Sequence, residues 1–251
     1  MENSDNQSMD SNWLTLYRAG ALSPLVAIAF YLVEFSLLIV GEPYPSGIAG
    51  WYALVQRSKL LALWYLNALD ILSFVLLGIM FLALYVALRR VRPAWMLIAV
   101  YLALLGVAVF IVPRTLHLSL LPLSDLHAAA TTDAQRALYL AAGEALSQVS
   151  SATPQTLGFL LMAAAGLIIS LVVLRSGQQR LPIGTAAAYV GVIGFVAALA
   201  NYLARLLAPD MAAMIMPVNG LLWFAWWILV SVGLFKLAST ISGQEMDSVT
   251  G

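Results

Sequence analysis

The sequence predicts an all-α, polytopic bundle of six transmembrane helices with both termini in the cytoplasm. Of its 251 residues, 62% are hydrophobic and only 10% are charged, whereas soluble domains usually carry about 25% charged residues. Six segments are apolar over the length of about 20 residues that a helix needs to cross a bilayer. A bilayer accommodates this much apolar side chain, which a soluble core could not hide.

The predicted transmembrane domain covers residues 18–238, between a polar N-terminal tail (1–17) and a polar C-terminal tail (239–251). The opening MENSDNQSMDSNW lacks the basic start of a signal peptide, so the first span is expected to stay uncleaved. The second span is long enough to tilt or to extend beyond the bilayer. The six spans are expected at about residues 19–40, 60–88, 95–112, 156–174, 184–206 and 219–237.

Two short basic loops predict the orientation. The loop RRVRPA contains Arg89, Arg90 and Arg92, the loop RSGQQRLP contains Arg175 and Arg180, and neither contains an acid. Both loops fall on the same side of a six-span chain, and short loops rich in Lys and Arg are typical of the cytoplasmic side. We therefore expect a multi-pass protein of the cell inner (cytoplasmic) membrane.

The outer connection between the third and fourth spans, residues 113–153, is expected to contain an amphipathic helix. Thr132 and Gln135 fit a capping box. Apolar residues then recur at helical spacing, namely Leu138, Ala141, Ala142, Ala145 and Val149. We expect this helix to lie on the outer surface or to cap the bundle.

Charged groups inside spans mark candidate functional positions, because each costs roughly 2.5–3.5 kcal/mol at a helix centre on insertion scales. Asp70 follows Lys59 by about 16 Å along a continuous helix, which predicts a position near the membrane midplane. Asn67 and Ser73 share its helical face. Glu34 lies in the first span, near its outer end.

Further polar residues are predicted at the outer ends of the third, fifth and sixth spans. Together with Asp70 they suggest a polar cleft open to the outside. Structural roles are equally open at this point: Asp70 could hydrogen-bond a neighbouring helix, and the arginines could contact lipid head groups. The predicted ligand-binding residues are Asp70, Asn67, Glu34, Arg205, Asn201, Arg114 and His117.

The sequence predicts no metal, no cofactor and no catalytic residue. It contains no cysteine, and its two histidines, His117 and His127, have only Asp125 nearby. A catalytic zinc site needs three protein ligands, so this pattern is a weak basis for an intramembrane enzyme. The net charge of zero gives no reason to expect nucleic acid as a partner.

Two patterns concern helix packing. Trp223, Trp226 and Trp227 share one face of the last span, which predicts packing or, less simply, the wall of a hydrophobic ligand site. A stripe of small residues in the fifth span favours close helix contacts, within the bundle or between protomers. The stripe consists of Ala187, Gly191, Gly194 and Ala198.

Several segments resemble a family of small bacterial multi-pass membrane proteins, domain-of-unknown-function family 4386. They are YRAGAL, RSKLLALWYLNALDILSFVLLGIMFLALYVALRR, YLAAGEAL and TLGFLLMAAAGLIISLVVLRSGQQRLP, within about residues 17–238. The resemblance implies a six-helix bundle and no assigned activity. Members of that family often carry an acid near the start of the last span, where this chain has Asn219.

The leading functional hypothesis is a non-enzymatic membrane protein. It would bind a lipid, a hydrophobic small molecule or a protein partner through the outward-facing cleft. One alternative is a proton- or ion-coupled transporter of small solutes that uses Asp70 as its titrating group. Another is an accessory subunit of a membrane complex, or a homo-oligomer, for which the small-residue stripe is the only hint.

Overall fold

The computed structural model describes the backbone of residues 13–41, 44–66, 68–151, 153–176, 183–207 and 209–250. Within these ranges the chain is helical and contains no strand. The helices are α2 (Leu14–Val40), α3 (Gly47–Arg57), α4 (Lys59–Tyr65), α5 (Ala68–Leu88), α6 (Pro93–His117), α7 (Leu120–Ala129), α8 (Asp133–Ser151), α9 (Thr153–Arg175), α10 (Thr185–Leu207) and α11 (Pro209–Thr250).

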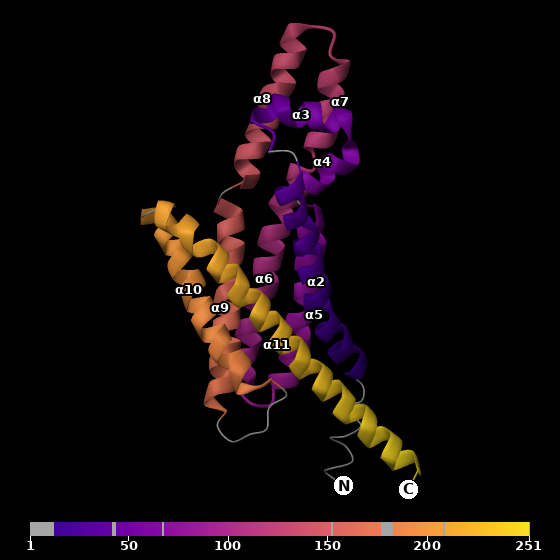
Figure 1. Cartoon of the computed structure of the whole chain (residues 1–251), viewed down its shortest axis with the longest axis vertical. Helices are drawn as coiled ribbons and strands as arrows, with labels where there is room; N and C mark the ends of the chain where they lie inside the picture. The colour runs from indigo at the N-terminus through magenta and orange to yellow at the C-terminus, as the bar shows by residue number, and fades with distance from the viewer. Residues whose placement is uncertain are drawn as a thin grey trace.

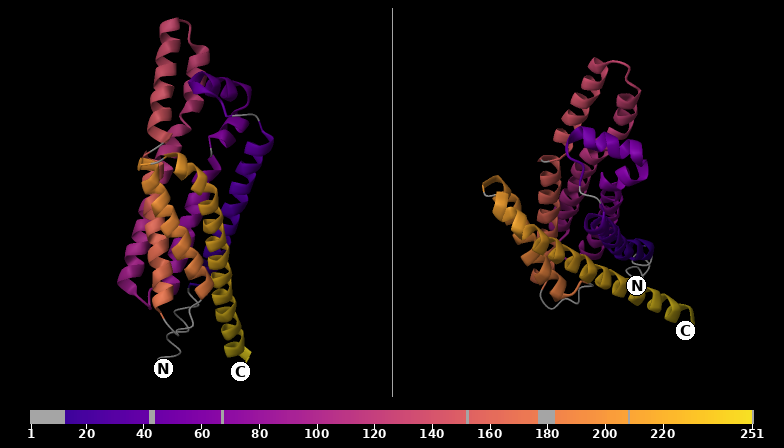
Figure 2. Two further views of the ribbon diagram at one scale, coloured as in Figure 1. Left: turned by 60° about the vertical axis from the view of Figure 1, so that its left-hand side comes forward. Right: turned by 45° about the horizontal axis from the view of Figure 1, so that its top comes forward.

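Six of these helices form a closed ring (Figure 1). Each of α2, α5, α6, α9, α10 and α11 packs against its neighbour in this order, and α11 returns to α2. All six are long and apolar enough to cross a membrane, which confirms the predicted multi-pass, all-α bundle. The start of α2 and the end of α11 lie at the same end of the molecule (Figure 2), as an even number of spans requires.

The second predicted span differs from the structure, because it is interrupted. We expected one helix over residues 60–88, but α4 ends at Tyr65 and α5 begins at Ala68. Asp70 therefore lies in the first turn of α5, about 27 Å from the far end of that helix at Leu88. Since the hydrocarbon core is about 30 Å thick, a span over Ala68–Leu88 has Asp70 near one of its ends and not at its middle.

The long outer connection folds into a hairpin of α7 and α8, with α3 lying across it (Figures 1 and 2). Half of the predicted capping box is present, since the Gln135 N–H donates to Thr132 Oγ1 over 3.2 Å. The Gln135 side chain accepts from the Thr131 N–H over 3.1 Å, one residue before the predicted partner. The Tyr52 hydroxyl of α3 donates to the Tyr139 carbonyl of α8 over 2.8 Å, and Gly143 leaves the space that this ring occupies. The amphipathic helix thus packs against α3 and α7 in a cap beyond the bundle.

Polar contacts fix the other side of the cap. The buried Ser124 hydroxyl donates to the Tyr52 carbonyl over 3.1 Å. Lys59 forms an ion pair with Asp125 across 2.7 Å, and Gln56 donates to the same carboxylate over 3.0 Å. Burial raises the pKa of the Tyr52 hydroxyl above its usual value, so it remains a hydrogen-bond donor at neutral pH. These contacts join α3, α4 and α7.

Small residues let the spanning helices approach closely. A Cβ on Gly106 of α6 would lie 2.8 Å from the Gly158 carbonyl oxygen of α9. In the predicted stripe of α10, Gly191 meets Ser170 and Trp226 and Gly194 meets Leu222. The stripe is therefore used inside the bundle, and it offers no support for a contact with a second protomer or a partner subunit.

Gly106→Ala is expected to destabilise the bundle by about 1–3 kcal/mol, because backbone atoms on α9 cannot move aside like a flexible side chain. The measurement is the thermal unfolding midpoint in one detergent. Gly220→Ala in α11 is the matched control, since a Cβ there meets nothing within 4 Å. We expect this control to be neutral or stabilising. Equal losses in both variants would contradict the close crossing of α6 and α9.

Candidate functional site

An ion pair between two spanning helices forms the centre of the candidate site. Arg114 Nη2 of α6 lies 3.3 Å from Asp70 Oδ2 of α5, and the two side chains are only 11% and 9% exposed. The ends of the two helices place these side chains together, because α5 starts two residues before Asp70 and α6 continues through Pro113 to His117. Both charged groups therefore reach the same level of the bundle, about 27–32 Å from the inner ends of their helices.

Glu34 of α2 joins this pair. Its carboxyl group is close enough to that of Asp70 to hydrogen-bond with it, and both carboxyls interact electrostatically with Arg114. The Tyr31 hydroxyl, one turn earlier on α2, interacts electrostatically with the same three groups, Glu34, Asp70 and Arg114. We call Glu34, Asp70 and Arg114 the charged cluster.

The charged cluster contains two carboxyl groups and one guanidinium. With both acids ionised it would hold a buried net negative charge, and burying an uncompensated charge is costly. One additional proton or one monovalent cation would make the cluster neutral. The arrangement can therefore hold a proton or bind a positively charged group.

Buried polar atoms without a hydrogen-bond partner gather in the same outer half of the bundle. Asn201 lies about 24 Å along α10 from Thr185, and Ser73 lies about 22 Å along α5 from Leu88. Such unsatisfied atoms are uncommon in folded proteins and ask for a partner such as water, an ion or a ligand. The outer set comprises Glu34 Oε1, Ser73 Oγ, Arg114 Nε, both ring nitrogens of His117, Asn201 Oδ1, Asn219 Oδ1 and Trp223 Nε1.

An aromatic core fills the bundle next to the charged cluster. Phe74 of α5 stacks on Phe110 of α6 with ring centroids 3.5 Å apart, and the Arg114 guanidinium lies 5.2 Å from the centre of the Phe110 ring. Phe159 of α9 contacts both phenylalanines and also Trp223 of α11. The centre of the bundle is thus occupied by rings.

The tryptophans of α11 take part in this packing, which was one of the two predictions for them; the other was the wall of a hydrophobic ligand site. Trp226 lies edge-on to Phe195 at 4.9 Å. Trp227 lies 5.9 Å from Tyr31. All three indole side chains, including Trp223, are buried, so they contact other helices of the chain.

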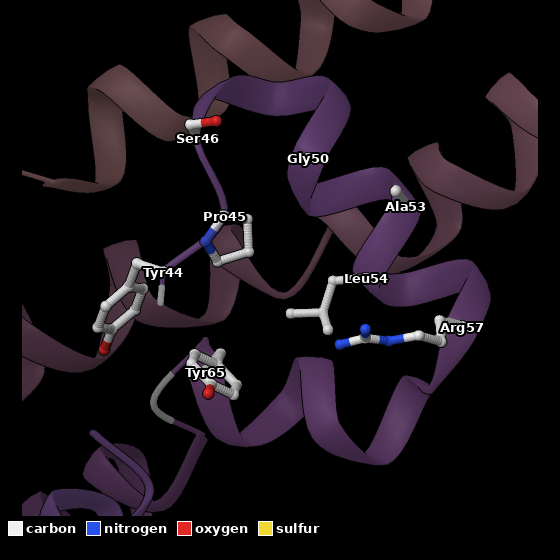
Figure 3. A pocket seen from close by; sticks show the side chains of 8 residues that line it. All are labelled: Tyr44, Pro45, Ser46, Gly50, Ala53, Leu54, Arg57 and Tyr65. Atoms are coloured by element: carbon white, nitrogen blue, oxygen red, sulfur yellow. The ribbon is translucent and has the colours of Figure 1, made fainter. Parts of the chain in front are cut away.

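A pocket of about 390 Å³ opens at the outer end, between α3, α4 and the segment that precedes α3. The side chains of Leu54, Arg57 and Tyr65 extend toward its centre, and Tyr44 lies at its side (Figure 3). Its lining residues are Tyr44, Pro45, Ser46, Gly50, Ala53, Leu54, Arg57 and Tyr65. Pockets of about 300–1,000 Å³ with mixed apolar and polar walls are typical of small-molecule sites.

A series of ring contacts leads from the wall of this outer pocket toward the charged cluster. Tyr44 lies edge-on to Tyr65, with centroids 5.4 Å apart, and 6.1 Å from Trp51 of α3. Trp51 in turn lies edge-on to His117 of α6 at 5.9 Å. His117 follows Arg114 by one helical turn, so one continuous set of contacts connects the pocket wall to the cluster.

The structure brings together only part of the predicted cleft. Asp70, Glu34 and Arg114 meet, and His117 and Asn201 are near the same level. Asn67 lies outside the described residues. Arg205 belongs to α10, but its side chain also lies outside them. Of the predicted residues with described side chains, none lines the outer pocket. The open cleft stays a prediction, and Asp70, Glu34 and Arg114 form a cluster apart from that pocket.

Several residues of this region were not identified from the sequence. Tyr44, Trp51 and Tyr65 are ordinary aromatic residues in the sequence, and no local pattern marks their contact with one another. Tyr31 could have been identified, because it precedes Glu34 by one helical turn and must share its face.

His117, His127 and Asp125, which the sequence offered as a weak metal-binding pattern, each contact a different residue. His117 packs against Trp51 and His127 against Tyr52, with centroids 5.9 Å and 5.2 Å apart. Asp125 pairs with Lys59. Within the described part of the chain, no three His, Asp or Glu side chains lie together in a way that could hold a metal ion.

No family model, curated protein or solved structure matches this chain. The resemblance to family 4386 therefore stays a prediction. The function has to be argued from the charged cluster and the outer pocket.

Arg114→Gln is expected to destabilise the protein more than Asp70→Asn. Loss of the guanidinium leaves two carboxyl groups together, whereas loss of the Asp70 charge still leaves Arg114 beside Glu34. Breaking a buried pair costs about 3–5 kcal/mol, and we expect Arg114→Gln to approach that range. Thermal unfolding in detergent measures both.

The exposed pair between Arg136 and Asp133 on α8 provides the control for this comparison. Arg136→Gln is expected to change stability by at most about 1 kcal/mol, as is usual for surface ion pairs. Equal losses for Arg114→Gln and Asp70→Asn would show that Glu34 is no alternative partner for the guanidinium.

Proposed function

We propose that this chain is a non-enzymatic protein of the cytoplasmic membrane that binds an amphiphilic small molecule or a lipid at the outer end of its bundle. The observation that carries the proposal is the position of the outer pocket, from whose wall a series of ring contacts leads toward a buried charged cluster. The pocket offers apolar contacts from Leu54, Pro45 and two tyrosines, and a guanidinium from Arg57.

The charged cluster supports binding over a purely structural role. A structural ion pair in a low-dielectric environment is stable when all of its polar atoms have partners. Among the described side chains, Glu34 Oε1 and Arg114 Nε lack hydrogen-bond partners, and the charged cluster contains two acids and one base. A ligand group that donates hydrogen bonds or carries a positive charge would supply the missing partners, after the rings of Tyr44 and Trp51 have moved aside.

A proton- or ion-coupled transporter is the second candidate, and one observation favours it. A second acid, Glu34, lies against Asp70. The cluster can thus exchange one positive charge, which is the minimum that coupling requires.

Filling the outer pocket tests the leading proposal. Ala53→Trp places a large ring at the pocket wall, and Ala137→Trp adds the same ring to an exposed position of α8. Native mass spectrometry of protein extracted in mild detergent is expected to detect one lipid or small molecule per chain that occupies the outer pocket, in the parent and in Ala137→Trp. Ala53→Trp is expected to lose it. An unliganded parent, or equal retention in both variants, would contradict the proposal.

Charge exchange at the cluster tests the transporter alternative. The thermal midpoint would be compared in sodium chloride and choline chloride at equal ionic strength, and at pH 5 and pH 8. Under this alternative the parent midpoint depends on sodium or on pH. Glu34→Gln is expected to remove that dependence, because one carboxylate then faces one guanidinium. Asp133→Asn, at an exposed acid of α8, should preserve that dependence. If the thermal midpoint of the parent depends neither on sodium nor on pH, the transporter alternative is excluded.

A further inference from the structure

A second hollow lies at the opposite end of the bundle, between α6 and α9. It has a volume of about 140 Å³. It lies about 30 Å along α6 from Arg114, so it is separate from the charged cluster and the outer pocket. Its lining residues are Arg92, Trp95, Ile168, Leu171, Val172 and Arg175.

The two arginines of this hollow come from the two acid-free loops. Arg92 directly precedes α6, and Arg175 is the last residue of α9, so two segments far apart in the sequence place one guanidinium each at the same hollow. Both residues are exposed, and no acid is among the described residues that line the hollow. The described lining therefore carries two positive charges.

The remaining lining residues match a lipid-facing boundary. Trp95, within the first turn of α6, is 52% exposed, and exposed tryptophans are typical of the level of lipid head groups. Ile168, Leu171 and Val172 follow each other on α9, one to two turns deeper than Arg175. The hollow thus has a cationic mouth, an aromatic rim and an apolar floor, in the order of a phospholipid's phosphate, glycerol region and acyl chains.

We propose that this hollow binds one anionic phospholipid of the membrane leaflet at the N-terminal and C-terminal ends of the chain. The phosphate lies between Arg92 and Arg175, and an acyl chain follows the groove between α6 and α9 past Leu171. Basic pockets between spanning helices on the cytoplasmic side are suited to such head groups. The small volume accommodates part of the head group and the start of that acyl chain at Leu171, and the rest of both acyl chains remains in the bilayer.

Lipid-selective stabilisation tests this site. The purified chain in a neutral detergent would be titrated with phosphatidylglycerol, phosphatidylcholine or inorganic phosphate, with the thermal midpoint and native mass spectrometry as readouts. We expect phosphatidylglycerol to raise the midpoint and to bind at one per chain. The double variant Arg92→Gln/Arg175→Gln is expected to bind it on the order of 30-fold more weakly, since each basic side chain near an anionic surface contributes about fivefold.

A matched variant separates the site from the general positive field of this end. Arg89→Gln/Lys236→Gln also removes two positive charges here, one of them from the same loop as Arg92, but neither residue lines the hollow. We expect it to keep the phosphatidylglycerol effect within about twofold. Equal loss in both double variants, equal binding of phosphatidylcholine, or the same shift with inorganic phosphate alone would each overturn the proposal.

Discussion

The ion pair between Asp70 and Arg114 governs the outer half of the bundle. A carboxylate in a low-dielectric setting is stable only beside a compensating charge, and Arg114 is the compensating charge that the described structure places there. This requirement fixes the start of α5 against the end of α6. It also explains why the charged groups collect near the ends of their spans, where desolvation is less costly than at the middle. Glu34 of α2 then shares this setting and ties a third helix to the same level.

The sequence was sufficient for the architecture because hydropathy acts over long windows. Six apolar segments, the basic loops and the capping residues Thr132 and Gln135 each have a direct physical signature, and the bundle with its outer amphipathic helix follows from them. The break between Tyr65 and Ala68 has no such signature. The two residues between them, Leu66 and Asn67, include neither proline nor glycine, and the interruption depends on how α4 packs beside α3 outside the bundle.

The candidate site was only partly predictable for a similar reason. Charged residues inside apolar segments stand out in a sequence, so Asp70, Glu34 and Arg114 were each predicted as candidate site residues. Which base meets which acid depends on the order of helices around the ring and on their relative heights. The rings of Tyr44, Trp51 and Tyr65 are positioned by tertiary contacts alone. Small residues were a clearer guide, because a stripe such as Gly191 and Gly194 has few uses other than close packing.

The junction of α6 and α7 has a structural consequence. Only Leu118 and Ser119 lie between the two helices, and Arg114 is within the last turn of the first. Tyr52 and Ser124 hydrogen-bond the hairpin of α7 and α8 to α3. The turn of α6 that carries the guanidinium is therefore also the turn from which the hairpin departs. The placement of the hairpin and the geometry of the only ion pair described between two spanning helices are thus set by the same few residues.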